Sequence, residues 1–196
     1  MTSSNYGFLH NERLPSEETI VTHCRNVGYD TTGTLLLLDD SSEVVIAWIK
    51  YGPNVTVHEA RTQDFAAKAL ANTPDCDLRV PRVFHAFTSD QRVCMVGYIA
   101  MEYIEGADCD SSDVDLVAKA VQALIGLRAP SLTLGHVGGG ALVHSFFLDW
   151  IPVADYKSVH DLDAHINNVS TWCLSAFHKV RGFERLNKAI HCIADP

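Results

Sequence analysis

An unbroken run of six apolar residues, 44–49, predicts a strand that is covered on both faces of a sheet. Lys50 follows this run, and a Gly-Pro pair then ends the strand. The next segment has the helical period, with Glu59, Ala66 and Leu70 on one face. We therefore expect Lys50 and Glu59 to point into one interior region and to form an ion pair, because a buried charge needs a partner.

The rest of the pattern predicts an α+β fold. Ser16 is the expected N-cap of the first helix, and Ser111 or Ser112 that of a later one. We expect residues 1–14 to be loosely ordered, and the pattern assigns no element to 178–196. The expected elements are a helix at 16–27, strands at 31–38 and 43–49, a helix from Glu59 to about residue 72, strands at 80–87 and 93–103 around a turn at 88–91, and helices at 113–127 and 158–177.

Composition narrows the function classes. The chain has 196 residues, 47% of them hydrophobic, and a formal net charge of -9, which argues against a nucleic-acid or anionic-membrane surface. No apolar run approaches the roughly 20 residues of a membrane span. The N-terminus lacks the pattern of a secretory signal, and the six cysteines have no framework spacing. We therefore expect a cytoplasmic protein with reduced thiols.

Five short motifs occur in order along the chain: IKYGP at 49–53, VTVHEA at 55–60, VPRV at 80–83, AMEYIEG at 100–106 and GGG at 138–140. Together they resemble the aminoglycoside-phosphotransferase-like branch of the protein-kinase-like superfamily, in particular its fungal members. The resemblance covers about residues 17–170. It implies a flexible N-terminus at 1–14, a kinase-like small lobe of antiparallel sheet plus helix at 15–105, and a truncated, mainly helical remnant of the large lobe at 106–196.

The resemblance also implies a ligand site. In kinases, a lysine–glutamate pair of this kind positions nucleotide phosphates, which assigns that role to Lys50 and Glu59. The segment that begins with Met101, Glu102 and Tyr103 resembles the hinge between kinase lobes, where backbone groups would bind an adenine edge. These five residues are the expected ligand-binding set, in the cleft between the lobes.

The catalytic loop of this branch, typically His-Gly-Asp-x-x-Pro, is not intact. His191 and Pro196 lie in its register, but the position of the catalytic base is Ile193, which can neither accept a proton nor bind a metal. Asp195 is two positions late, and the sequence stops before the asparagine and aspartate that would hold magnesium. We therefore assign no catalytic residue, and we expect neither a metal nor a cofactor.

Other groups of residues give only weak indications of a metal or catalytic site. His160 and His165 are five residues apart, which separates them by about 140° on a helix, so a zinc site is not expected. Ser145, His144 and Asp149 could be assembled into a triad, but no G-x-S-x-G elbow supports it. For the glycines at 138–140 we expect a turn or packing role.

Three functions follow from this reading. The first is a kinase-fold protein without phosphotransfer machinery that binds a small molecule, either a nucleotide or a metabolite. The second is an enzyme of another type, a cyclase, isomerase or lyase, in the inherited cleft, with Lys50, Glu59 and a nearby histidine as acid and base. The third is a small-molecule phosphotransferase that another chain completes.

The partner expected besides the small molecule is a second copy of the chain. Helices at 113–127 and 158–177 each carry an apolar stripe that the remaining elements do not obviously cover. Capping of the lobe by residues 178–196 is the alternative. Bulky aromatic residues add to the same surface: Phe146, Phe147, Trp150, Trp172 and Phe177.

Overall fold

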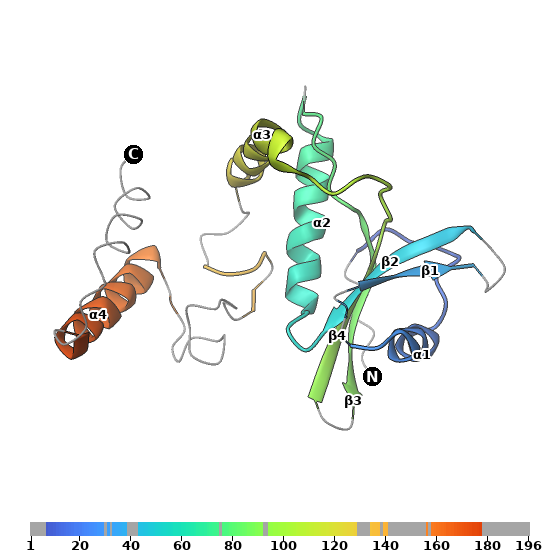
Figure 1. Cartoon of the computed structure of the whole chain (residues 1–196), viewed down its shortest axis with the longest axis horizontal. Helices are drawn as coiled ribbons and strands as arrows, with labels where there is room; N and C mark the ends of the chain where they lie inside the picture. The colour runs from blue at the N-terminus through green and yellow to red at the C-terminus, as the bar shows by residue number, and fades with distance from the viewer. Residues whose placement is uncertain are drawn as a thin grey trace. The chain divides into compact units, whose positions relative to one another are not determined.

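The computed structural model of the chain describes residues 7–29, 31, 33–38, 43–74, 76–91, 94–128, 134–137, 139–140, 156 and 158–177, with side chains of the last helix up to residue 168. The chain forms two compact units, 1–151 and 152–196, each of which is considered by itself (Figure 1). The expected boundary at residues 105/106 stays a prediction. Several predictions concern residues outside the described ranges. These are the catalytic-loop match at 191–196, the possible triad of His144, Ser145 and Asp149, and the residues Gly138, Phe146, Phe147 and Trp150.

The first unit contains a four-stranded antiparallel sheet. Its strands are β1 (Gly33–Leu37), β2 (Val45–Gly52), β3 (Val83–Gln91) and β4 (Cys94–Met101). They lie in the order β1-β2-β4-β3, so β2 and β4 are central. With its helices, this sheet makes the fold α+β, as the sequence predicts.

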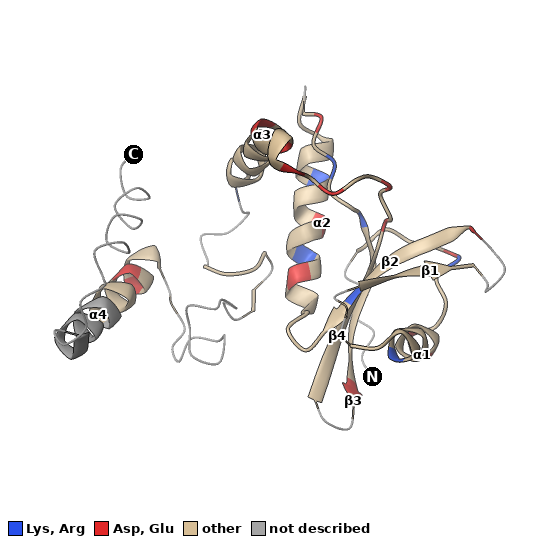
Figure 2. Cartoon of the chain, viewed as in Figure 1, with Lys and Arg blue, Asp and Glu red and all other residues tan. Residues whose placement is uncertain are grey.

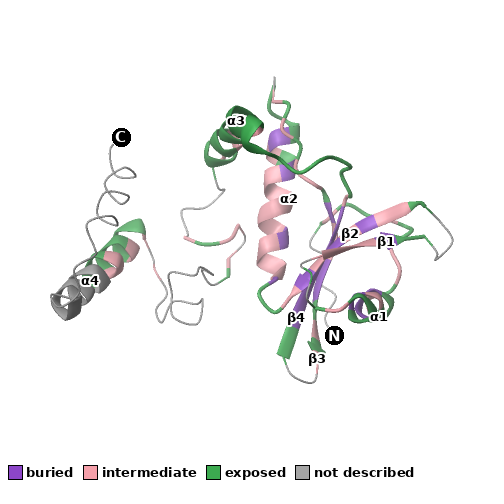
Figure 3. Cartoon of the chain, viewed as in Figure 1, coloured by how far each residue is buried: buried purple, intermediate pink, exposed green. Residues whose placement is uncertain are grey.

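Both faces of the sheet are covered, because alternate residues of the central strands point to opposite sides. Ala47, Ile49 and Tyr51 of β2 are buried in one core with Ile20 and Cys24 of α1 (Glu17–Val27) (Figure 3). A second core on the other face joins Ala60 of α2 (Val57–Ala71) to the sheet. The sheet and loop residues of that second core are Val55, Val83, Ala86, Ile99 and Met101, with Phe8, Trp48 and Val57 packed against them.

The predicted ends of α1 are confirmed. The Ser16 hydroxyl accepts a hydrogen bond from the Thr19 amide at 3.3 Å. At the other end, the Gly28 amide donates to the Cys24 carbonyl, and Gly28 has a φ of 101°, which glycine adopts without strain. Local hydrogen bonds therefore mark both ends of this helix.

The predicted turn at 88–91 is wrong. These residues belong to β3 and pair with β4, from Thr88 opposite Gly97 to Gln91 opposite Cys94. Their polar side chains are typical of turns, but an antiparallel edge strand also tolerates them where one face is solvated. The pairing of β3 with β4 therefore extends to Gln91 opposite Cys94.

Two further helical segments follow in the first unit. A short 3-10 helix, η1 (Ser111–Asp113), leads into α3 (Val114–Ile125). The expected serine cap is wrong, because Asp110 caps η1: its carboxylate accepts from the Ser112 amide at 2.7 Å, and the Asp113 carboxylate accepts from the Asp110 amide. An aspartate one residue earlier is the better-placed acceptor.

The second unit contains α4 (Val159–Phe177). The Ser158 hydroxyl accepts from the Asp161 amide at 3.2 Å, so the predicted start of this helix is confirmed. No helix in the described part of the chain is long and apolar enough to cross a membrane.

Candidate functional site

The ion pair expected between Lys50 and Glu59 is present. Lys50 lies on the central strand β2, opposite Gly33 of β1 and Ile99 of β4. Its ammonium group donates to the Glu59 carboxylate, which comes from the first turn of α2. The pair therefore ties a central strand to the helix that covers the sheet.

This pair is more exposed than the sequence predicts. The side chains of Lys50 and Glu59 are 40% and 30% exposed, so both charges keep contact with water. The predicted strand of six apolar residues also continues through Lys50 to Gly52. The alternation along β2 explains the exposure: Ile49 and Tyr51 are buried on the α1 side, whereas Lys50 points to the other face, where α2 covers the sheet only in part.

The loop between β2 and α2 fixes the position of Glu59. The Thr56 hydroxyl caps α2 by accepting from the Glu59 amide at 3.1 Å. The loop carbonyl of Val55 lies so close to β4 that a Cβ at Gly97 would be only 1.9 Å from its oxygen. A glycine in the central strand therefore lets the loop approach, and α2 begins where Glu59 can reach Lys50.

The three hinge candidates have different environments. Met101 is buried at the end of β4, and its sulfur accepts from the Gln63 amide group at 3.3 Å. The Glu102 amide donates to the Arg82 carbonyl at 2.8 Å, so this backbone donor is already used within the chain. Tyr103 is exposed. The three residues thus follow one another at the end of the central strand β4, and of their side chains only that of Tyr103 is exposed.

The Glu102 carboxylate is clamped by two arginines that the sequence analysis did not single out. Arg79 donates to it at 2.6 Å, and Arg82 donates at 2.9 and 3.3 Å. The hydrogen bonds from Arg82 hold the pKa of Glu102 below its ordinary value, and burial opposes them. The sequence does not reveal this cluster, because Arg79 and Glu102 are 23 residues apart in the chain. Arg82 does belong to the motif VPRV, but nothing in that motif points to Glu102.

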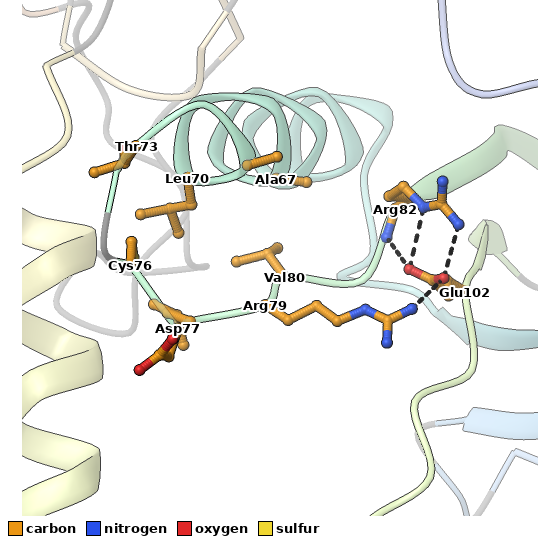
Figure 4. A pocket seen from close by; sticks show the side chains of 11 residues that line it. Ala67, Leu70, Thr73, Cys76, Asp77, Arg79, Val80, Arg82 and Glu102 are labelled. Atoms are coloured by element: carbon orange, nitrogen blue, oxygen red, sulfur yellow. Dashed lines mark hydrogen bonds and ion pairs between the residues drawn. The ribbon is translucent and has the colours of Figure 1, made fainter.

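A pocket of about 310 Å³ adjoins this cluster (Figure 4). Figure 4 shows Ala67 and Leu70 of α2 on one side and Val80 on the other, with Arg79, Arg82 and Glu102 at one end. Of the five predicted ligand-binding residues, only Glu102 lines it. The pocket lies along the last turns of α2, whereas Glu59 is in the first turn, about 16 Å away along the helix axis.

A second group missed by the sequence analysis lies on α2 beside the glycine-rich segment. The Thr62 hydroxyl accepts from the Val137 amide at 3.0 Å, and the rings of His58 and His136 stack with centroids 6.3 Å apart. Gly140 lies against the His58 ring, because a Cβ there would be 2.5 Å from it. The packing role expected for this segment is thus seen at Gly140.

Burial lowers the pKa of His58, and the charges of Arg61 and His136 lower it further. The His58 Nδ1 atom is buried and has no hydrogen-bond partner among the described residues. The neutral His58 ring therefore acts as a packing surface for Gly140 and His136.

Within the described ranges, no three His, Cys, Asp or Glu side chains converge as a metal site would require. The geometry that can bind a ligand consists of an accessible lysine held by a glutamate, beside the central strand β4, which ends at Met101. The chain matches no protein-family model, no curated protein and no solved structure.

Proposed function

We propose that this chain carries a kinase-like small lobe of the aminoglycoside-phosphotransferase-like type and binds a small anionic molecule, a nucleotide or a metabolite, beside Lys50 and Glu59. The observation that carries the proposal is the ion pair between a central strand and the first turn of the following helix. Kinases use a strand lysine and a helix glutamate in this arrangement to hold nucleotide phosphates.

The exposure of the pair supports a binding role over a purely structural one. An ammonium group has three N–H donors, so a lysine that gives one to Glu59 can also bind a phosphate or carboxylate oxygen. Glu59 fixes the lysine in place, which reduces the entropy lost when a ligand binds. A solvent-accessible pair of this kind contributes little to stability, so its geometry is better explained by a ligand.

The proposal includes binding without phosphoryl transfer. Ile193 occupies the position at which the catalytic loop of the resembled family has its base, and an aliphatic side chain can neither take the proton nor hold magnesium. We expect the pure protein to show no magnesium-dependent turnover of ATP. Turnover that Lys50→Met abolishes would contradict this part of the proposal while supporting the site.

Binding is tested by calorimetric titration of the protein with ATP and ADP, with and without magnesium, and with a panel of phosphorylated metabolites. We expect at least one of these probes to bind the wild type and to lose tenfold or more in affinity with Lys50→Met. Lys68→Met is the matched control, because Lys68 is a second lysine paired with an acid, Asp64, at 2.7 Å, but on the exposed side of α2. Equal losses in both variants, or no binding by any probe, would overturn the proposal.

A further inference from the structure

Helix α3 has an apolar stripe that nothing in the described part of the chain covers. Val114, Val117, Val121 and Leu124 are spaced by three, four and three residues, so they share one helical face. These side chains are 42–63% exposed, and no residue of α3 is buried (Figure 3). Such a stripe is unfavourable in water, since each square ångström of apolar surface left exposed forgoes about 25 cal/mol.

The stripe is a different side of α3 from the one with the least exposed residues. The residues of α3 with partial burial are Ala120 and Ala123, and Asp113 and Leu127 flank them on the same side of the helix. The stripe is rotated from that side by roughly a quarter of a turn. Leu116 and Ile125, outside the stripe, are 64% and 78% exposed, so α3 carries exposed apolar side chains around most of its circumference.

The sequence of the stripe is complementary to itself. A spacing of three, four and three is the same in both directions, so two copies of α3 that run antiparallel bring Val117 opposite Val121 and Val114 opposite Leu124. This spacing suits an isologous contact, in which the same patch of the two copies meets.

The charges at the two ends of α3 favour the same arrangement. Asp110, Asp113 and Asp115 gather at its start, and Arg128 follows its end (Figure 2). An antiparallel pair places the acidic start of each helix near Arg128 of the other copy and also opposes the two helix dipoles. A parallel pair would bring like charges together at both ends.

We propose that α3 is the contact between two copies of this chain, packed as an antiparallel helix pair through Val114, Val117, Val121 and Leu124. The proposal is independent of the ligand site, which uses other residues. Twelve residues of helix span about 18 Å. This contact is small beside the roughly 800 Å² per partner of a standard interface, so the dimer is weak and depends on concentration.

Sedimentation equilibrium from micromolar to millimolar protein tests the contact. We expect the mass of the wild type to rise from 21.6 kDa toward twice that value. Val121→Glu should weaken the dimer at least tenfold, and the adjacent Gln122→Glu, which adds the same charge outside the stripe, about 100° around the helix from Val121, should leave it unchanged. Val121→Ser removes apolar area without a charge and should also weaken the dimer, so a folding defect in one variant does not decide the result.

Arg128→Ala tests the orientation of the pair. The antiparallel arrangement predicts a weaker dimer, whereas an unchanged or stronger dimer would overturn this arrangement. A wild type that stays at 21.6 kDa throughout would overturn the proposal and mean that another segment of the same chain covers the stripe. Equal weakening by Val121→Glu and Gln122→Glu would also overturn it.

Discussion

Gly97 of β4 lies directly against the carbonyl group of Val55: a Cβ at position 97 would be 1.9 Å from the oxygen and 2.6 Å from the carbon. Both atoms belong to backbone, which cannot move aside as a flexible side chain can. Val55 precedes the cap of α2, so this contact determines where that helix begins. The position of Glu59 relative to Lys50 thus depends on the absence of a side chain at Gly97 in β4.

Gly97→Ala should therefore destabilise the protein. Overpacking a well-packed position typically costs about 1–3 kcal/mol, and contact with backbone on a central strand puts this variant at the upper end. Urea unfolding measures the loss. Gly106→Ala is the control, because a Cβ at position 106 meets nothing within 4 Å, and its stability should stay close to that of the wild type. Equal stability of the two variants would contradict the close approach.

The Lys50–Glu59 pair should contribute little to stability. The sequence predicts a buried pair, for which removing one partner costs about 3–5 kcal/mol. At 40% and 30% exposure, we instead expect a coupling energy of about 0.2–1 kcal/mol from a double-mutant cycle of Lys50→Met and Glu59→Gln in urea. A coupling above about 2 kcal/mol would mean that the pair is structural, and would weaken the case for a ligand.

His58 should make the folded state sensitive to mild acid. Its folded pKa lies below the ordinary value of 6.5, so the unfolded chain binds the proton more readily. The stabilisation from the neutral ring is complete above about pH 6.5 and is lost as the pH falls from there toward the folded pKa.

The test compares unfolding free energies of the wild type and His58→Gln between pH 7.5 and pH 5.5. The wild type should lose more stability than the variant over this range. Glu102 does not confuse the comparison, because its pKa is lowered from an ordinary value of 4.5 and it titrates below this window. An identical pH dependence in both proteins would show that His58 does not titrate with folding.

Cys24 should resist thiol reagents in the native protein. It is fully buried between α1 and the sheet, and burial raises its pKa to about 12, so almost no reactive thiolate forms at neutral pH. Cys94 and Cys109 are exposed. Iodoacetamide labelling followed by peptide mapping should modify these two well before Cys24, and all three at similar rates in urea. Early labelling of Cys24 would mean that α1 opens readily.

The sequence by itself determined the elements whose signals are local. Ser16 and Gly28 set the ends of α1, Ser158 the start of α4, and the helical period of α2 gave Glu59 its direction. The apolar run before Lys50 predicted the strand, and the two together predicted the ion pair. These features depend on residues close together in the chain, where spacing fixes geometry.

Contacts between distant segments decided the rest. Local chemistry placed a turn at 88–91, but pairing with β4 kept these residues in β3. The exposure of Lys50, the arginine clamp on Glu102 and the packing of Gly140 on His58 likewise join segments that are far apart in sequence. Burial and partner choice depend on which surfaces meet, and a periodic pattern gives the face of an element but not what covers it.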